Sequence, residues 1–333
     1  MHNTSPLPRH TTLAIFALLV LGLFAGMIRT YFAAEYQYAT LTMMMDGTAV
    51  IPLQFRVLGA WIIKGIWETT GMDLSQLVRY YESVVFILST LAIYLYGKAT
   101  GLSKPAALLT GCALLFLYPY YFVYQPLGHF YYPGDTLSIL FTALGLWLLA
   151  EKRFNWFAIL LTIAFFNRES IVLLIPLFLF TSYKQIPNNK LVLYLVLYSA
   201  VFLIDKSILA ELFGNNPGAG TVSLDHDIFH HGWPRSLETS RVYSNTLLFF
   251  SLDGALFFLS YAGFLWLPVL VGYSQISSVF VKRSLWLIPL SLLLMFPVAN
   301  FNEPRIYADL APIILIATAH ALKQLRQEST HPC

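Results

Sequence analysis

The sequence contains few charged residues and almost no cysteine, and each shortage excludes a class of protein. Only 11% of its 333 residues are charged while 57% are hydrophobic, and because soluble domains carry about 25% charged residues, a soluble fold is excluded. Its two cysteines are Cys112, inside an apolar run, and Cys333, the last residue, so neither a disulfide framework nor a cysteine metal site is expected. A net charge of only +3 gives no support for nucleic-acid binding.

Hydrophobicity does not alternate with a period of two residues, so a membrane β-barrel is not expected. Instead the chain contains apolar runs, most of them near the roughly 20 residues that cross a hydrocarbon core about 30 Å thick. The runs are Thr12–Phe32, Leu77–Gly97, Ala106–Val123, Thr136–Ala150, Phe154–Phe166, Ser170–Tyr183, Leu191–Glu211, Leu247–Gly272, Leu285–Ala299 and Ile306–Leu322. They predict an all-α membrane protein: a multispanning helical bundle of about ten membrane segments, in a single membrane domain over residues 1–333 with long outer loops at 33–76 and 213–246.

The charges separate onto two sides when these runs are counted as spans that start inside. The first run follows Arg9 as in a signal sequence, but it is longer than a signal's apolar region, so we interpret it as an uncleaved span. Excess Lys and Arg marks the cytoplasmic side, which predicts a multi-pass protein of the bacterial inner (cytoplasmic) membrane with both termini inside. The inner positions are Arg9, Lys98, Lys104, Lys152, Arg153, Lys184, Lys190, Lys282, Arg283, Lys323 and Arg326, opposed by Glu151 and Glu328. The outer positions are Asp46, Asp135, Glu169, the cluster from Asp225 to His231, and Glu303.

The segment 154–183 is interrupted only by Asn167, Arg168 and Glu169. As one helix it would be about 45 Å long with an ion pair near its middle, where an ionisable group costs roughly 2.5–3.5 kcal/mol. A re-entrant or broken helix pair avoids that cost. Irregular backbone at membrane depth is tolerated where it lines a cavity, so the break predicts a cavity open to the outside.

Several outer residues are candidates for chemistry. Asp46 suits a general base at the membrane surface, and Arg56 can bind a phosphate with two parallel hydrogen bonds; the alternative for Asp46 is a turn residue that caps a helix. Asp135 is expected to be the N-cap of the fourth span, and this structural role can be its whole contribution.

The charged groups at the break and before the last span are further candidates. An Arg–Glu pair at membrane depth is costly and indicates function: Arg168 as an anion binder, Glu169 as the residue that orients it, and Asn167 beside them. The alternative is a self-neutralising structural pair. Arg305 is opposed by the dipole of the helix it begins, which an anion or Glu303 would relieve.

A group of side chains in the second long outer loop can ligate a divalent metal. Oxygen and imidazole ligands suit Mn, Zn or Mg, although the spacing matches no specific zinc pattern and a solvated polar loop is the alternative. The residues are Asp225, His226, Asp227, His230 and His231. No other cofactor is indicated.

The chain resembles bacterial multispanning proteins of the GT-C glycosyltransferase type between Thr12 and Leu322. The resemblance rests on the order of Asp46, Phe55-Arg56-Val57-Leu58, Tyr132 to Asp135, Asn167-Arg168-Glu169 and Glu303 to Arg305. It implies a GT-C-like bundle and an inverting enzyme that moves a sugar from a polyprenyl-phosphate carrier to a glycan, lipid or protein acceptor on the extracytoplasmic face. It also implies Asp46 as catalytic base, with Glu35 second, and Arg168 and Arg305 as ligands of the carrier phosphate.

Two other functions stay open on the sequence. A polymerase of O-antigen or exopolysaccharide also carries outer arginines, and product length would separate it from a transferase. A transporter or flippase needs polar residues through the bilayer, and the spans offer little beyond Asp205, Lys206 and Asp253. The expected partners are a polyprenyl-phosphate-linked sugar donor, a glycan, lipid or protein acceptor, and membrane lipid, and not nucleic acid.

Overall fold

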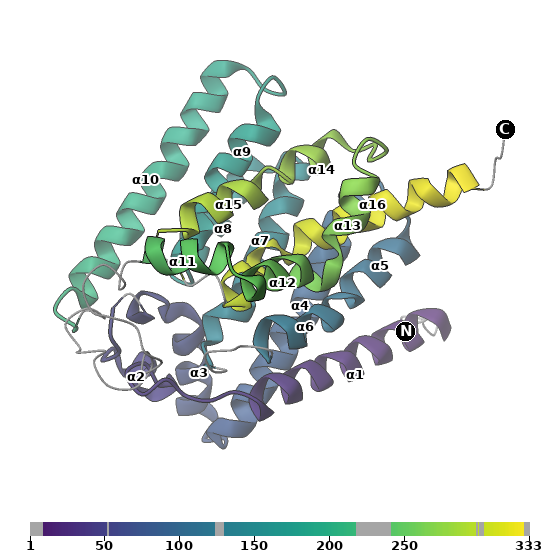
Figure 1. Cartoon of the computed structure of the whole chain (residues 1–333). Helices are drawn as coiled ribbons and strands as arrows, with labels where there is room; N and C mark the ends of the chain where they lie inside the picture. Colours follow the sequence, from purple (N-terminus) through teal and green to yellow (C-terminus); the bar gives the residue numbers. More distant parts are fainter. Residues whose placement is uncertain are drawn as a thin grey trace, which may run out of the picture.

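The computed structural model describes residues 9–51, 53–123, 130–217, 241–297, 299 and 303–329, and its regular structure within these ranges is helical apart from two isolated β-bridges (Figure 1). Five helical stretches are long and apolar enough to cross a membrane: Leu74–Ala99, Lys104–Phe122, Pro133–Ala150, Asn188–Phe213 and Pro304–Lys323. The chain is therefore an all-helical protein with several helices suited to a membrane. Ten full spans are not observed in the described residues.

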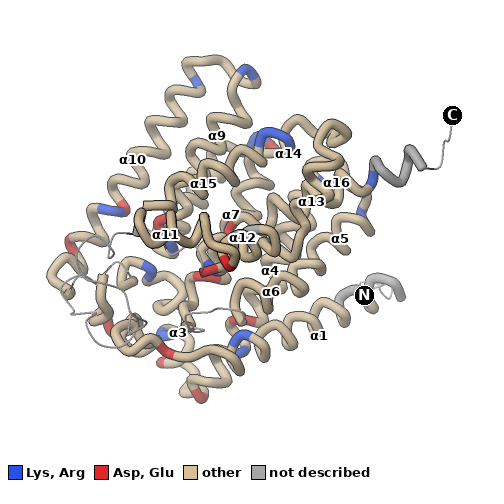
Figure 2. The backbone as a smooth tube through the Cα atoms, viewed as in Figure 1, with Lys and Arg blue, Asp and Glu red and all other residues tan. Residues whose placement is uncertain are grey.

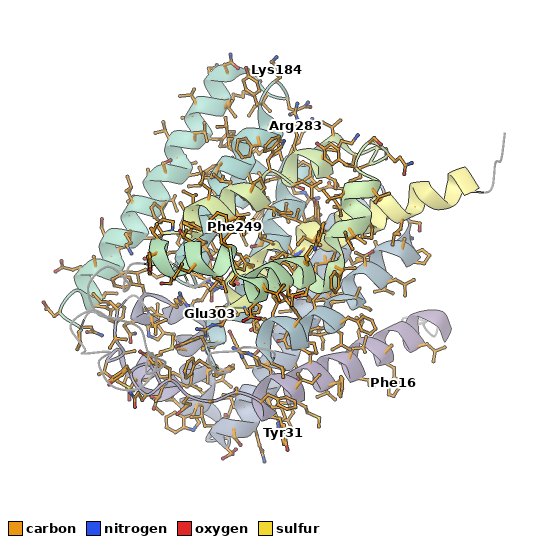
Figure 3. The ribbon with its side chains drawn as sticks, in the orientation of Figure 1. Phe16, Tyr31, Lys184, Phe249, Arg283 and Glu303 are labelled. Carbon is orange, nitrogen blue, oxygen red and sulfur yellow. The ribbon has the colours of Figure 1, made fainter. Side chains whose placement is uncertain are left out.

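Helix α1 (Arg9–Tyr31) and helix α4 (Leu74–Ala99) pack closely along their length. Gly22 and Gly26 face α4, and a β-carbon on Gly26 would overlap Ser83; small residues four apart let helix backbones approach. On its other side α1 presents large apolar groups such as Phe16 and Tyr31, which are 65% and 83% exposed and project outward in Figure 3. This packing delivers the end of α1 to the candidate site.

The first long loop forms three short elements, α2 (Leu41–Asp46), η1 (Leu53–Phe55) and α3 (Val57–Thr70). The buried Gln54 ties them together, since its amide nitrogen donates to the carbonyl of Met44 at 3.3 Å and its oxygen accepts from the amide of Ala49 at 2.9 Å. Gly59 lets α3 approach the chain just before the fourth span, because a β-carbon there would lie 3.0 Å from Pro133.

Helix α7 (Pro133–Ala150) is the centre of the bundle, with 83% of its span buried. It follows α5 (Lys104–Cys112) and α6 (Leu114–Phe122), and it contacts α4, α8 and η4. Because so many elements surround α7, side chains from distant parts of the chain meet at its first turn.

The chain from 154 to 183 folds back on itself, as the sequence predicts. Its arms are α8 (Phe154–Phe165) and η2 with α9 (Glu169–Leu173, Leu174–Ser182). The ring centroids of Phe154 and Phe178 lie 5.4 Å apart, so the two open ends of the hairpin meet. At the closed end, the amide of Asn167 donates to the carbonyl of Gly134 at 2.8 Å, which fixes the break to the start of α7.

The second half differs more from the prediction. Helix α10 (Asn188–Phe213) is a long helix at the periphery of the bundle, and only 17% of its span is buried. The expected single span Leu247–Gly272 is instead four short pieces, because Ala262, Gly263 and Phe264 adopt left-handed backbone with φ of 50°, 62° and 63°, which ends a right-handed helix. The four pieces are α11 (Arg241–Phe249), whose end overlaps the expected span, α12 (Leu252–Ser260), η3 (Tyr261–Phe264) and α13 (Trp266–Val271).

The expected span Leu285–Ala299 is also short. It contains only the nine residues of α15 (Leu287–Met295), about 14 Å at 1.5 Å per residue, which does not cross a hydrocarbon core. The remaining elements are α14 (Val279–Ser284), η4 (Pro304–Leu310) and α16 (Ala311–Ser329).

The two ends of the bundle differ in charge (Figure 2). Lys and Arg gather at the turns after α4, α7 and α9 and in α14, as the sequence predicts for one side of a membrane. We call this the basic end; Figure 3 shows Lys184 and Arg283 there. The start of α7, the break at Asn167 and the start of η4 lie at the other end, together with most of the acidic residues.

Candidate functional site

The candidate site is built around Asp135 in the first turn of α7. The side chain of Asp135 is fully buried, and neither of its carboxylate oxygens accepts a hydrogen bond from the described residues. The expected N-cap role is wrong: Tyr132 is the cap and Pro133 starts the helix, because proline suits the first helical position. One turn later, the carboxylate is free to face other elements.

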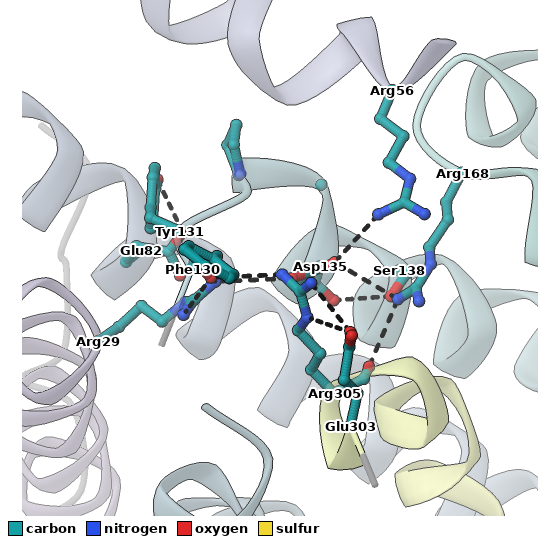
Figure 4. Close-up of polar contacts among 12 residues, drawn as sticks. Arg29, Arg56, Glu82, Phe130, Tyr131, Asp135, Ser138, Arg168, Glu303 and Arg305 are labelled. Atoms are coloured by element: carbon teal, nitrogen blue, oxygen red, sulfur yellow. Dashed lines mark hydrogen bonds and ion pairs between the residues drawn. The ribbon is translucent and has the colours of Figure 1, made fainter. Parts of the chain in front are cut away.

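Four arginines surround this carboxylate (Figure 4). They come from the last turn of α1, the residue before α3, the break at 167–169 and the start of η4. The distances are 3.6 Å from Arg29 Nη2 to Oδ2, 4.0 Å from Arg56 Nη1 to Oδ1, 3.5 Å from Arg168 Nη1 to Oδ1 and 3.6 Å from Arg305 Nη1 to Oδ2. We call these five residues the Asp135 cluster.

Arg29 is the most enclosed member, with no exposed surface. Its guanidinium donates to the carbonyl of Phe130 at 3.4 and 3.5 Å and lies 4.7 Å and 5.1 Å from the ring centres of Phe122 and Tyr131. Aromatic faces stabilise a cation in a dry environment. These contacts therefore hold Arg29 in place within the Asp135 cluster.

Arg305 is held by a neighbouring carboxylate, as the sequence suggests. Its Nε and Nη2 donate to one oxygen of Glu303 at 3.2 and 3.0 Å, and its Nη1 donates to the carbonyl of Phe130 at 3.4 Å. The ring of Tyr132 lies 4.5 Å beneath the guanidinium. These contacts relieve the unfavourable position of a cation at a helix start.

Arg168 shares its charge between two acids. Its Nη1 lies 3.6 Å from Asp309 as well as 3.5 Å from Asp135. Asp309 also accepts hydrogen bonds from the hydroxyls of Ser138 and Ser170, the latter at 2.5 Å. The break, α7 and η4 are thus connected through one carboxylate.

Glu82 of α4 lies beside Arg29 without forming an ion pair with it in the described residues. Its two oxygens accept from the hydroxyls of Tyr118 and Tyr131, each at 3.0 Å. Burying a carboxylate is costly unless it is hydrogen-bonded or paired with a cation, and this pair of tyrosines holds Glu82 in place.

Glu169 does not orient Arg168, contrary to the expectation. Arg168 has extended backbone, with φ −163° and ψ 136°, and successive side chains of extended backbone point to opposite sides. Glu169 instead forms an ion pair with Lys206 of α10, whose ammonium also lies 4.3 Å from the ring centre of Phe55.

Arg56 is the least satisfied member of the cluster. Its guanidinium makes no hydrogen bond within the described part of the chain, and its only ion pair there is the 4.0 Å contact with Asp135. Its side chain is 21% exposed, against none to 9% for the other three arginines. Burial and the nearby Arg168 lower the pKa of Arg56 from its ordinary value, so its charge is short of compensation.

The two expected catalytic acids lie in different surroundings, and both are exposed. Asp46, the last residue of α2, forms an ion pair with Lys64 at 3.0 Å. Glu35 follows Ala34, whose carbonyl accepts from the amide of Tyr131 at 2.8 Å, and its own carboxylate accepts from the amide of Leu41 at 3.4 Å. The backbone at Glu35 therefore runs beside the Phe130 segment that holds Arg29 and Arg305.

The expected metal ligands Asp225, His226, Asp227, His230 and His231 lie outside the described residues. Within the described ranges, no three His, Cys, Asp or Glu side chains are grouped to hold a metal ion.

The sequence reasoning missed Arg29 of the cluster and the acids around it, Glu82 and Asp309 with its two serines. Each charged residue lies in or at the end of an expected span, and an ionisable group within a span indicates function or a buried partner. That signal could have found them, although it does not say which residues meet.

No protein-family model matches the chain, and no curated protein shows a significant match to it.

Proposed function

We propose that the chain is a membrane glycosyltransferase that takes a sugar from a polyprenyl-phosphate carrier and transfers it to a glycan, lipid or protein acceptor. The reaction takes place at the end of the bundle that contains the Asp135 cluster. Lys and Arg gather at the opposite end, which supports placing the cluster outside the cytoplasm. The observation that carries the proposal is the partly exposed and undercompensated Arg56 at the edge of the Asp135 cluster.

The charges around Asp135 divide into a fixed set and one available group. Arg29 has Phe130 and two aromatic rings, Arg168 has Asp309, and Arg305 has Glu303. Within the described residues, Arg56 has only the 4.0 Å contact with Asp135 and the ring of Tyr132 at 6.0 Å. A guanidinium with unused donors binds a phosphate with two parallel hydrogen bonds, so the carrier phosphate occupies the exposed side of Arg56.

The other arginines contribute through the field that they create at this position. A phosphate that leaves with the electron pair of the broken bond gains negative charge in the transition state, and fixed cations nearby stabilise that charge. Because these arginines are already held by protein groups, they need no reorganisation during the reaction.

The chemistry is a direct displacement at the anomeric carbon. An acceptor hydroxyl loses its proton to a carboxylate, its oxygen bonds to the sugar carbon, and the bond from that carbon to the phosphate oxygen breaks. Glu35 and Asp46 are the candidate bases. Glu35 has the stronger structural argument, because the preceding residue, Ala34, pairs through its backbone with the segment that holds two arginines of the cluster, whereas Asp46 is neutralised by Lys64.

The test is a turnover assay in liposomes with a panel of polyprenyl-phosphate sugars. We expect the wild-type protein to consume one donor and release polyprenyl phosphate, and Glu35→Gln to lower turnover at least about 100-fold, as loss of a general base does. Asp46→Asn separates the two candidates. Glu68→Gln is the matched control, since Glu68 is an exposed acid of the same loop near the same lysine.

Two outcomes contradict the proposal. The first is that no donor of the panel is consumed by a folded wild-type protein. The second is that a lipid-linked glycan is lengthened into a ladder of products while single sugars are ignored, which would make the chain a polymerase.

A further inference from the structure

The basic end of the bundle contains a cavity of about 140 Å³, far from the Asp135 cluster. It lies where the turn between α7 and α8, the end of α9 and the short helix α14 meet. Its lining residues are Leu149, Ala150, Lys152, Phe154, Thr181, Ser182, Gln185, Val279, Phe280 and Arg283. The lining therefore combines apolar side chains with two cations, two hydroxyls and an amide.

The cations of this cavity differ in what they already contact. The Nη1 of Arg283 is within 3.0 to 3.4 Å of the carbonyls of Phe180, Thr181 and Tyr183, so Arg283 caps the C-terminus of α9. Lys152 is exposed, and its ammonium makes no hydrogen bond or ion pair within the described residues. A left-handed φ of 56° at Lys152 turns the chain between α7 and α8 at this position.

Two further groups favour an anion here. Helix α8 begins at Phe154 on the cavity wall, and the residue before it offers no side-chain cap; the free amides of such a helix start attract negative charge. Ser182 is 4% exposed and lines the cavity, yet its hydroxyl has no hydrogen-bond partner among the described residues. The hydroxyl of Ser182 therefore has hydrogen-bonding capacity, both as donor and as acceptor, that an anion in the cavity can use.

We propose that this cavity binds the phosphate of an anionic lipid headgroup. Its volume is below the roughly 300 Å³ at which pockets for larger ligands begin, so it fits a headgroup phosphate rather than a nucleotide. The apolar wall formed by Leu149, Val279 and Phe280 suits the glycerol and the first part of an acyl chain. Basic pockets between membrane helices on the cytoplasmic side bind such headgroups.

The surroundings place the cavity at a membrane surface. Trp156, one turn into α8, and Tyr183, at the end of α9, are 61% and 50% exposed, and such aromatic residues gather at the level of lipid headgroups. A bound phosphate would join Lys152, the start of α8 and Ser182, and would therefore close the open end of the hairpin. The proposal is independent of the proposed glycosyltransferase activity.

The test is native mass spectrometry of delipidated protein titrated with phosphatidylglycerol, with phosphatidylcholine as the neutral lipid. We expect saturable binding of one phosphatidylglycerol, and Lys152→Ala to weaken it about fivefold, which corresponds to one cation at a membrane surface. Ser182→Leu, which fills the cavity without changing charge, should weaken it as well. Lys190→Ala is the control: it removes an exposed cation of the same end that does not line the cavity.

A thermal unfolding curve in the same detergent shows that each variant is folded. Binding by folded Lys152→Ala and Ser182→Leu at wild-type strength would overturn the proposal, as would an equal loss in Lys190→Ala. Inorganic phosphate at millimolar concentration forms a separate arm: if it binds the wild-type cavity while phosphatidylglycerol does not, the source of the phosphate is soluble and the lipid assignment is wrong.

Discussion

The two ends of the bundle use arginine and lysine in opposite ways. At the basic end the cations are mostly exposed and each contacts its own surroundings, as Arg153 does with the Trp147 ring 5.3 Å away. At the other end, four arginines from four separate elements converge on the single buried carboxylate of Asp135.

This difference separates the cations that orient the protein in the membrane from those that we assign to its function. Scattered cations in water cost little and suffice to orient a membrane protein. Buried ions cost several kcal/mol each in desolvation and are retained only where they are paired and bonded. Three arginines at the Asp135 cluster meet that condition, and the fourth, Arg56, meets it only in part. The cost of the incomplete pairing is the reason to assign a ligand to that end.

The largest effect should come from removing the centre of the cluster. Asp135→Asn leaves four buried or half-buried guanidiniums without their common counter-charge, and breaking a buried pair costs about 3–5 kcal/mol. We expect the free energy of unfolding in mixed micelles to fall by that amount, or the protein not to fold. Adding Arg29→Met should recover part of the loss. The control is Glu151→Gln, an exposed acid of the basic end, and an equal effect there would remove the distinction between the ends.

An intermediate effect is expected at the break of the hairpin. Asn167→Ala removes the buried 2.8 Å hydrogen bond to the carbonyl of Gly134 that joins the break to α7, and the loss of such a bond costs about 0.5–1.5 kcal/mol. Chemical denaturation measures this loss. Asn155→Ala, at the open end of the same hairpin, removes an exposed contact with Tyr194 and should change stability by less than about 0.5 kcal/mol. Similar losses in both variants would contradict a special role of the break.

The smallest effect should come from the pair formed by Glu169 and Lys206. Both side chains are about 40% exposed, at 43% and 39%, and exposed ion pairs contribute about 1 kcal/mol or less. Lys206→Met should therefore lower the free energy of unfolding by no more than that. Lys190→Met on the same helix provides the baseline. A loss of several kcal/mol in Lys206→Met would show that this pair belongs to the buried network and not to its edge.

The fold of the first seven apolar runs could be predicted because each is set by local pattern. The break in the segment 154–183 follows from Asn167, Arg168 and Glu169 alone, since an uninterrupted helix would bury charge in the bilayer. The run Leu247–Gly272 misled the prediction, because its residues are apolar throughout while its left-handed backbone at Ala262 to Phe264 leaves no signal in composition.

The candidate site could be predicted only in part. Arg168 and Arg305 were identified from their own unfavourable positions, which sequence reveals. The partners were not: Arg168 meets Asp309, 141 positions away in the chain, rather than its neighbour Glu169. Such pairing depends on which helices surround α7, and one sequence does not contain that information.

The most direct test of the central claim is the binding of polyprenyl phosphate to Arg56→Ala in detergent, compared with Arg79→Ala. Arg79 is an exposed arginine near the start of α4 at the same end, without an ion pair in the described residues. We predict that Arg56→Ala weakens binding at least about tenfold, as loss of charge-assisted hydrogen bonds does, with little change in stability, and that Arg79→Ala binds like wild type. Equal affinity of the two variants would contradict the assignment of the phosphate to the Asp135 cluster.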